Sequence, residues 1–389
     1  MSVWGQDPAV LRCDHRPPSD PRAGDPGGGG VRSADEVLAW SRALLDPALR
    51  DAVETLPGTM RDIAAFHFGW RDVRGRSASG ASGKAIRPAL TLLAARAVGG
   101  AAETALPAAV AVELAHNFSL LHDDVMDGDL TRRHRPTAWT VYGTSAAVLA
   151  GDALLAAAFE ALVAAPPRPA PGPDASDLNA PAPDAAGGSP ALARSVRTLG
   201  HAVTDLVEGQ NTDLAFEERD DVTLDECVAM AGRKTGALIG AACALGASHG
   251  GGTSVQTARL HAFGERLGLA FQLVDDLLGI WGDPAVTGKA VHADLYSRKK
   301  SLPVVAALTS ATPAGAELAA LYLSDEPLSG DDASRAAALI DAAGGRAWAA
   351  ERADALLADA LHELDAADLA AVPAAELRAL ARLIAHRDR

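Results

Sequence analysis

Aromatic residues and cysteines are both scarce in this chain. Only 4% of the 389 residues are aromatic, and the three cysteines, Cys13, Cys227 and Cys243, form no CxxC pair. This cysteine usage excludes a disulfide framework and indicates a reducing compartment without structural zinc. Alanine and leucine supply much of the 48% apolar fraction, and both residues favour helix over strand. The composition therefore predicts an all-α protein.

The chain also lacks an excess of positive charge and a long uninterrupted apolar run. Its formal net charge of -15 argues against general affinity for nucleic acid or anionic lipid, so an anionic ligand needs locally placed cations or metal ions. The N-terminus has no apolar signal segment. The most apolar stretch, residues 146–165, contains Asp152 and Glu160, which argues against a membrane span. We expect a cytoplasmic protein.

Two segments are too poor in apolar residues to offset the entropy of ordering them. Residues 1–32 are rich in Pro, Gly, Asp and Arg, and residues from about 166 to 190 are rich in Pro and Ala. Both are predicted to be disordered, either as inert linkers or as docking segments for an unknown partner. The rest of residues 33–389 forms one helical domain that the second segment interrupts.

Helical signals are strong throughout this domain. Capping-box spacing is present at Ser33 with Glu36 and at Thr223 with Glu226, and Pro107 suits a first helical turn. No alternating strand pattern or fixed repeat is apparent, and the pattern predicts a bundle of about ten to twelve helices. Further apolar-periodic runs cover residues 84–98, 138–164, 191–217, 223–247, 256–278, 301–323, 331–344, 346–366 and 373–387.

An acidic motif lies in residues 116–139, which read HNFSLLHDDVMDGDLTRRHRPTAW. Asp123 and Asp127 lie one helical turn apart on the same face, and His116 lies two turns before Asp123. Carboxylates at this spacing suit Mg²⁺, which takes one or two of them together with phosphate oxygens and water. A solvated acidic face is the alternative for DDxxD alone. The arginines that follow favour a magnesium–diphosphate site, since guanidinium forks match phosphate, and they are Arg132 and Arg133.

Further phosphate-binding candidates lie on both sides of this motif. In GKAIRP, Lys84 and Arg87 are three residues apart at the expected start of a helix, a site for a diphosphate without metal. GKAIRP is not a P-loop, because no glycine stands five residues before Gly83. In residues 271–303 a second acidic pair ends an apolar helix ahead of several lysines. The candidates in this half of the chain are Lys234, Thr235, Gln272, Asp275, Asp276, Lys289, Lys299 and Lys300.

These motifs together resemble those of the trans-isoprenyl diphosphate synthase, or polyprenyl synthetase, family. GKAIRP, the HDDVMD segment, GRKTG and FQLVDD…GK…RKKSLP follow the family's order over most of residues 34–389. The resemblance implies a Mg²⁺-dependent prenyltransferase that joins isopentenyl diphosphate to an allylic diphosphate. It also implies a homodimer of isoprenoid-synthase-type helical bundles, each with a central cavity between two facing Asp-rich motifs.

The same resemblance implies a role for each candidate residue. Isopentenyl diphosphate would bind to Lys84, Arg87, His116 and Arg133. The allylic diphosphate would bind through three Mg²⁺ held by Asp123, Asp127 and Asp275, and its charge would be balanced by Arg132, Lys234, Lys289 and Lys300. Thr235 and Gln272 would lie beside the allylic cation. Catalysis would rest on Asp123, Asp127, Arg132, Lys234 and Asp275.

The chain departs from the family's pattern at one carboxylate. The second motif usually reads DDxxD, but its third position here is Gly279, and Asp283 lies a further turn along. We expect weaker binding of the third Mg²⁺, or water in place of the ligand, rather than loss of activity.

Product length is expected to depend on the residues just before the first motif. Phe118 and Ser119 lie five and four residues before Asp123, one aromatic and one small. This pair resembles enzymes that stop at the twenty-carbon geranylgeranyl product, with the fifteen-carbon farnesyl product as the nearest competitor. Phe118 could instead serve only in core packing.

Two other functions compete with this interpretation. A class I terpene cyclase shares the implied fold, but it needs an Asn/Asp-Ser-Glu metal triad where this chain has Asp275 and Asp276. A non-catalytic subunit of a hetero-oligomeric synthase would fit the glycine at position 279, but such subunits usually lose the first Asp motif, which is intact here.

Overall fold

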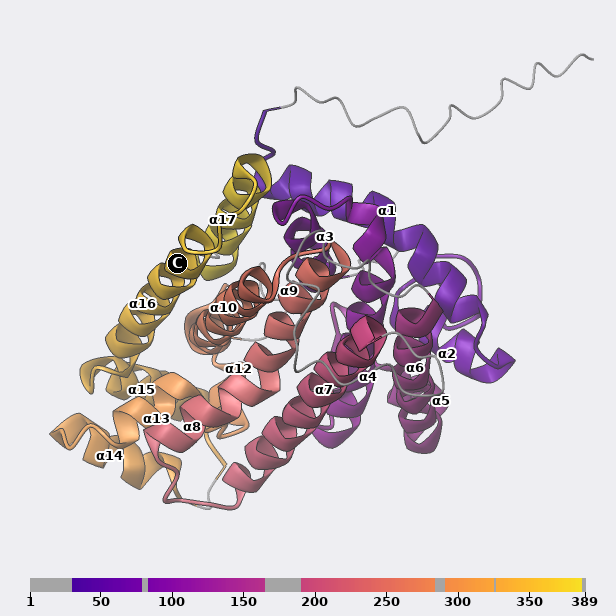
Figure 1. Ribbon diagram of the computed structural model, residues 1–389. Coiled ribbons are helices and arrows are strands. Elements are labelled where there is room, and N and C mark those ends of the chain that lie inside the picture. The colour runs from indigo at the N-terminus through magenta and orange to yellow at the C-terminus, as the bar shows by residue number, and fades with distance from the viewer. Residues whose placement is uncertain (1–29, 79–82, 165–189, 284–290, 325–326, 387–389) are drawn as a thin grey trace, which may run out of the picture.

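The computed structural model describes residues 30–78, 83–164, 190–283, 291–324 and 327–386. These ranges are almost wholly helical, which confirms the all-α prediction (Figure 1). The two segments predicted to be disordered lie outside the described residues except at their edges. At those edges, Arg32 pairs with Glu376 at 2.7 Å, and Pro190 begins a helix.

The N-terminal half builds one side of the bundle around a long central helix, α4 (Leu106–Met126). α4 packs against α6 (Thr144–Ala164) and α3 (Ile86–Ala97), and Leu114 and Leu154 are among the fully buried side chains of this layer. The remaining elements of this half are α1 (Ala34–Glu54), α2 (Gly58–His67), η1 (Ala102–Ala105), β1 (Thr131–Arg132), β2 (Arg135–Pro136) and α5 (Ala138–Tyr142).

The C-terminal half wraps around a second long helix, α10 (Ser254–Trp281). In Figure 1, α9 and α10 occupy the middle of the molecule, with α16 and α17 on one side and α4, α5 and α6 on the other. The elements beside α10 are α7 (Pro190–Glu217), α8 (Leu224–Ala231), the π-helical turn η3 (Gly232–Gly236), α9 (Ala237–His249), α12 (Ala293–Tyr296), α13 (Leu302–Leu308), α14 (Pro313–Tyr322), α15 (Gly330–Ala342), α16 (Gly345–Asp365) and α17 (Ala371–Ala385).

Glycine lets the helices that carry the site approach closely. An added Cβ at Gly268 of α10 would lie 2.7 Å from the Cα of Gly236 in η3, and one at Gly209 of α7 would lie 2.7 Å from the Cα of Lys234. Real Cβ atoms do not approach other atoms so closely, so both contacts require glycine. These contacts seat η3 between α7 and α10.

Several helix boundaries were predicted from local chemistry. Both capping boxes form, with Ser33 and Thr223 as N-caps, and Pro107 lies in the first turn of α4. The run predicted at 138–164 instead breaks at Gly143, where φ is 87°. The run predicted at 301–323 is two helices, α13 and α14, bent by 117°.

Two further expectations about backbone structure were wrong. α3 begins at Ile86, after Ala85 in the left-handed region (φ 50°), so Lys84 precedes the helix rather than sharing its face with Arg87. The hairpin β1–β2 was not expected either, because each of its strands has only two residues. An alternating pattern cannot show in so short a segment.

Two stretches among the described residues are long and apolar enough to cross a membrane by length and composition. They are Ala102–Met126, with 72% of its apolar window buried inside the protein, and Thr144–Ala164, with 39% buried. The first contains α4, whose apolar side chains form the bundle core. The second contains α6, whose exposed face carries Leu149 and Val163 together with the acidic residues Asp152 and Glu160.

Candidate active site

The first acidic motif lies at the C-terminal end of α4. The amide of Asp127 donates to the carbonyl of Asp123 (2.8 Å), so the two residues are one turn apart, as their spacing predicted. Burial raises the pKa of Asp123 to about 6, against the opposing effect of Lys234 and with the support of Asp127. The pKa of Asp127 is also raised, chiefly by partial desolvation. For both carboxylates, burial thus outweighs the favourable effect of the nearby cations.

The middle carboxylate of the motif, Asp124, has a different environment. Its Oδ1 accepts a 2.6 Å hydrogen bond from Arg132 Nε, while its Oδ2 is buried without a partner among the described residues. Burial raises the pKa of Asp124, and Arg132 opposes this shift. Asp124 thus holds Arg132 at the edge of the site. Sequence reasoning named Arg132 but not the aspartate that positions it.

The hairpin β1–β2 presents the arginine pair. Arg132 and Arg135 are paired residues of its two strands, and Arg133 and His134 form the turn with φ of 54° and 61°. Arg135 donates to the carbonyl oxygens of Phe66 (2.8 Å) and Arg71 (3.3 Å), which fastens the hairpin to the end of α2 and the residues after it. Arg132 pairs with Asp124 of α4, whereas the Arg133 guanidinium lies over Gly83, and both side chains line one small pocket.

Arg133 meets the residues predicted to bind isopentenyl diphosphate. An added Cβ at Gly83 would lie 2.6 Å from Arg133 Cζ, so its guanidinium lies over the GKAIRP segment. Arg87 donates to His116 Nε2 (3.1 Å). Burial lowers the pKa of His116 well below its usual value, and Arg87 and Arg133 lower it further. The histidine is therefore neutral beside cationic groups, and exposed Lys84 lies next to Gly83.

A set of hydrogen-bonded polar side chains lies next to the cations Arg87 and Arg133. Asn117 Nδ2 donates to Glu113 Oε1 (3.1 Å), and His67 Nε2 donates to Asn117 Oδ1 (3.2 Å). Burial raises the pKa of Glu113, with Arg87 opposing the shift. Burial lowers the pKa of His67 to about 3, and Arg132 and Arg133 add to that effect.

The second acidic motif lies on α10. Asp276 is buried and serves a structural role, because its two oxygens accept hydrogen bonds from Gln272 Nε2 (2.8 Å) and from the amide of Leu302 (3.0 Å). Thr235 Oγ1 donates to Gln272 Oε1 (2.6 Å), so one chain of hydrogen bonds links η3, α10 and α13. Asp275, which precedes Asp276, is half-buried on another face of α10.

Two lysines lie between the acidic motifs. Lys234 Nζ donates to Asp213 Oδ2 of α7 at 2.6 Å, and its charge also acts on Asp123 and Asp127 of α4. Burial lowers the pKa of Lys299, but nearby carboxylates outweigh burial and raise it above its usual value. The carboxylates that do so are Asp213, Asp276, Asp294 and Asp127.

The structure distinguishes Lys299 from its neighbour Lys300. Lys300 is buried on another side of the chain, where its Nζ donates to the carbonyl of Glu217 (3.3 Å) and burial lowers its pKa. Sequence reasoning assigned the diphosphate to Lys300, and that role stays a prediction. Lys299 lies among the carboxylates, and sequence reasoning gave it no role. Because both lysines precede α13, helical periodicity cannot tell them apart. Lys289 lies outside the described residues.

Asp213 was also missed. It stands on α7 three residues after Gln210, in a run that sequence analysis treated as an ordinary amphipathic helix. Asp213 stands four residues before Glu217, but no recognisable motif surrounds this pair, so the sequence alone did not single it out. Only the packing of α7 on η3 reveals its contact with Lys234.

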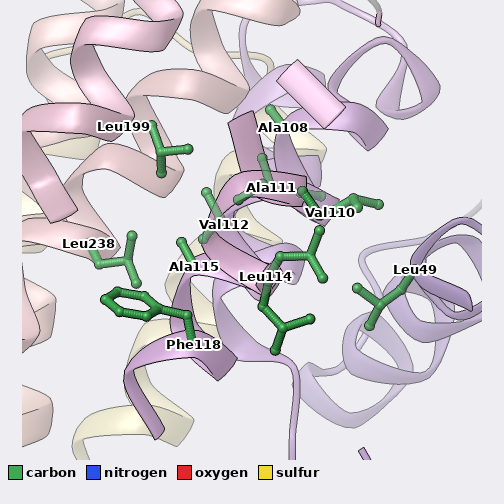
Figure 2. Close-up of a cluster of buried hydrophobic side chains, with 14 of the residues drawn as sticks. Leu49, Ala108, Val110, Ala111, Val112, Leu114, Ala115, Phe118, Leu199 and Leu238 are labelled. Carbon is green, nitrogen blue, oxygen red and sulfur yellow. The ribbon is translucent and has the colours of Figure 1, made fainter. Parts of the chain in front are cut away.

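Phe118 lies below the first motif, in the apolar core between α4 and its neighbours. It is 5% exposed, and Figure 2 shows its ring beside Leu238 of α9. Its other face meets the imidazole of His122 edge-on, with ring centroids 5.0 Å apart. Ser119 is buried and its Oγ donates to the carbonyl of His116 (2.8 Å). A growing apolar chain that enters between the acidic motifs would meet Phe118.

The donor set fits magnesium bound together with a diphosphate. Among the residues that the structure describes, no three His, Cys, Asp or Glu side chains converge to hold an ion by themselves. Mg²⁺ needs only one or two carboxylates when phosphate oxygens and water complete its shell. Asp123 and Asp127, whose pKa values are raised, supply such a pair.

Comparison with known proteins identifies the family. The polyprenyl synthetase family model matches residues 75–340. A (2E,6E)-farnesyl diphosphate synthase of Mycobacterium tuberculosis is 43% identical over 356 residues, which cover 90% of this chain and 93% of the relative. A geranylgeranyl diphosphate synthase of the same species is 43% identical over 352 residues, which cover 90% and 93%. The crystal structure of a polyprenyl synthetase from Streptomyces coelicolor superposes with a TM-score of 0.81 at 43% identity, covering 90% of this chain and 99% of that one.

The chain therefore belongs to the polyprenyl synthetase family. It is a prenyltransferase with the all-helical isoprenoid synthase fold that forms short-chain prenyl diphosphates. The family uses isoprenoid diphosphates as substrates and divalent metal ions in catalysis. The family, the fold and the reaction class predicted from the sequence motifs are all confirmed.

Proposed function

We propose that this protein condenses isopentenyl diphosphate with an allylic diphosphate to give geranylgeranyl diphosphate. One observation supports the condensation: carboxylates of both Asp-rich helices, Asp127 of α4 and Asp276 of α10, raise the pKa of Lys299. The charges of the two helices thus act on one cation, and a separate group is formed by Arg87, His116 and Arg133. This arrangement supports two diphosphate sites of different character.

Charge accounts for the order of events in this site. When bound, divalent metal ions neutralise the allylic diphosphate as its C–O bond breaks. Lys234 and Lys299 hold the released charge from the protein side. Arg87 and Arg133 hold isopentenyl diphosphate so that its double bond meets the allylic cation. The C–C bond that forms leaves a tertiary cation, which loses a proton from the adjacent carbon to a diphosphate oxygen. The apolar floor at Phe118 keeps water from capturing either cation.

The metal count and the individual side-chain roles belong to the same proposal. Three Mg²⁺ would be held by Asp123, Asp127 and Asp275. The side-chain oxygens of Thr235 and Gln272 would lie beside the allylic cation. The hydrogen bond between these two side chains, which joins η3 to α10, supports their placement together.

The product length rests on Phe118. The two Mycobacterium relatives share the same identity with this chain but are named for different products, so overall similarity does not decide between them. Phe118 with Ser119 in front of the motif supports the twenty-carbon product, and farnesyl diphosphate is the alternative.

We further propose that the protein is a cytoplasmic homodimer. Two exposed apolar side chains of α6 support dimerisation, since Leu149 is 55% and Val163 53% exposed on a helix of mean hydropathy 1.9. Apolar surface of this kind is usually covered by a partner. The segments 1–32 and 166–190 are proposed as inert linkers or as docking segments for another protein.

Product analysis tests the proposal directly. The purified protein is incubated with Mg²⁺, isopentenyl diphosphate and, in turn, the five-, ten- and fifteen-carbon allylic diphosphates. We expect a linear twenty-carbon diphosphate, and none after chelation of the metal or in Asp123→Asn. A fifteen-carbon end product would replace geranylgeranyl by farnesyl. Cyclic hydrocarbon from an allylic substrate alone would indicate a terpene cyclase, and no turnover with any starter would indicate a subunit that needs a partner.

A further inference from the structure

Another residue fills the position of the carboxylate missing from the second acidic motif. Gly279 lies one turn after Asp275 on α10, where the motif usually carries a third aspartate. An added Cβ at Gly279 would lie 2.5 Å from Cγ of Asp294 and 3.0 Å from its Oδ1. The carboxylate of Asp294 therefore occupies the space into which a side chain at position 279 would project. Gly279 and this placement of Asp294 depend on each other.

Asp294 is held there by the short helix α12. Its backbone carbonyl accepts a hydrogen bond from the amide of Lys299 (3.0 Å) and one from Ser297 Oγ (3.1 Å). His292 Nδ1 donates to the carbonyl of Ile280 (2.8 Å), which ties the start of α12 to the last turns of α10. Hydrogen bonds at both ends of α12 thus fix the position of Asp294 relative to α10.

The carboxylate of Asp294 interacts electrostatically with charged groups at the second motif. Its charge raises the pKa of buried Asp276 on α10 and that of Lys299. Lys299 in turn lies near Asp127 of the first motif. Asp294 is half-buried, and its carboxylate lies against α10 at Gly279, close enough to act on the charges of Asp276 and Lys299.

Asp283 is the other acidic residue near the end of α10, and it is placed less well. α10 ends at Trp281, and Gly282 has extended backbone with ψ of 149°. Asp283 therefore leaves the helix axis before it completes the turn that would align it with Asp275, and it is exposed.

We propose that Asp294 supplies the third carboxylate of the second metal-binding motif, with Asp275, and that Gly279 is needed to admit it. The motif is thus complete in space although it is interrupted in sequence. This inference rests on the proposed function, because the metal ions in question are those that accompany the allylic diphosphate. It replaces the expectation that water takes the place of the missing ligand.

Metal binding in the absence of turnover tests the proposal. Mn²⁺ affinity is measured by electron paramagnetic resonance on the full chain with inorganic diphosphate, for the wild type and for Asp294→Asn, an isosteric change. Loss of a carboxylate near a metal typically weakens affinity about 10- to 100-fold, and we expect a loss of that size at one Mn²⁺ site. Asp283→Asn is the matched control and should leave every Mn²⁺ affinity unchanged. Unchanged affinity in Asp294→Asn, or weakened affinity in Asp283→Asn, would overturn the proposal.

Two further variants separate this role from a defect in folding. Gly279→Ala keeps every charge but pushes the Asp294 carboxylate aside, so it should weaken the same Mn²⁺ site. The double change Gly279→Asp with Asp294→Asn returns the carboxylate to α10 and should restore affinity to within about threefold of wild type, well inside the loss expected for one ligand. Wild-type product formation is assayed on the same preparation. If the wild type makes prenyl diphosphate while Asp294→Asn binds Mn²⁺ normally, the proposed function stands and only this inference fails.

Discussion

At the scale of single residues, the site combines side chains whose type the sequence predicted with neighbours that only the fold reveals. Arg132 was expected at a diphosphate, and the structure adds that buried Asp124 holds it. Lys234 was expected as a cation, and the structure adds its partner Asp213. A motif marks the residues that contact substrate. It does not mark residues that position them from distant parts of the chain.

Phe118 should limit the length of the product. Its ring lies in the core below the first Asp motif, beside Leu238, so Phe118→Ala opens space for one or more additional five-carbon units. We expect the main product to lengthen beyond that of the wild type, as measured by chromatography and mass spectrometry after dephosphorylation.

Large-to-small changes in a core typically cost about 3–5 kcal/mol for phenylalanine, so the product comparison is made below the melting temperature of the variant. Val163→Ala, on the exposed face of α6, is the control and should keep the wild-type product. An unchanged product profile in Phe118→Ala would assign Phe118 to core packing alone.

His67 should make the protein less stable in mild acid. Burial, with Arg132 and Arg133, lowers the pKa of His67 to about 3, whereas the unfolded chain titrates near 6.5. A depressed histidine pKa means that the unfolded state binds the extra proton, so stability is complete above about pH 6.5 and falls as the pH is lowered toward 3. By pH 5.5 the loss from this one group is about 1.4 kcal/mol.

Urea unfolding at pH 7.5 and 5.5 measures this loss. His67→Gln keeps a polar side chain but cannot titrate, so its stability should fall less between the two pH values than that of the wild type. His116, whose pKa is also lowered, contributes in the same direction in both proteins and cancels in the comparison. Equal pH dependence in the two proteins would contradict the prediction.

At the scale of helices and turns, local chemistry predicted the starts of several elements and missed their breaks. Ser33 and Thr223 cap helices as expected because a capping box is a local interaction between residues three apart. The break at Gly143 and the bend between α13 and α14 depend on where neighbouring helices leave room. For the same reason the hairpin that presents Arg132 and Arg133 was not predicted.

Gly209 of α7 should be needed to position Lys234. Its missing Cβ leaves room for the backbone of Lys234, so Gly209→Ala should push α7 away from η3 and disturb the ion pair of Lys234 with Asp213. Overpacking of this kind typically costs about 1–3 kcal/mol, and we expect lower kcat as well as lower stability.

Gly200 on the same helix provides a matched control. An added Cβ there meets nothing within 4 Å, so Gly200→Ala should keep activity and raise stability by up to about 1 kcal/mol, the difference in helix propensity. Thermal unfolding and steady-state kinetics of both variants test the pair. Similar effects of the two substitutions would show that the close approach of α7 to η3 is not limiting.

At the scale of the whole molecule, the fold could be predicted because many motifs agreed in order and spacing. The way in which the site residues come together could not be predicted from the sequence. The helices that carry them, α4, α7, α10 and α12, come from well-separated parts of the chain. Asp294 illustrates the point: it is fifteen residues beyond Gly279 by their numbering, and only the fold brings the two together.

The exposed Leu149 and Val163 of α6 lead to a prediction about assembly. Leu149→Glu replaces one of these apolar side chains by a charge, and burial of an unpaired charge in an interface is costly. We expect the variant to sediment as a monomer at concentrations at which the wild type is a dimer. Val255→Glu, at a valine on α10 that is 63% exposed, should not change the oligomeric state, as analytical ultracentrifugation would establish. A monomeric wild type would remove the proposed interface.

The excess of carboxylates around Lys234 and Lys299 has a consequence for how substrates arrive. Before substrate binds, the space between α4 and α10 carries more negative than positive charge, so it repels a bare diphosphate and attracts one that already carries its metal. The cations Arg87 and Arg133 lie beside neutral His116 and would suit a diphosphate without metal. If so, two substrates with the same anionic group would be distinguished by whether each arrives with bound metal.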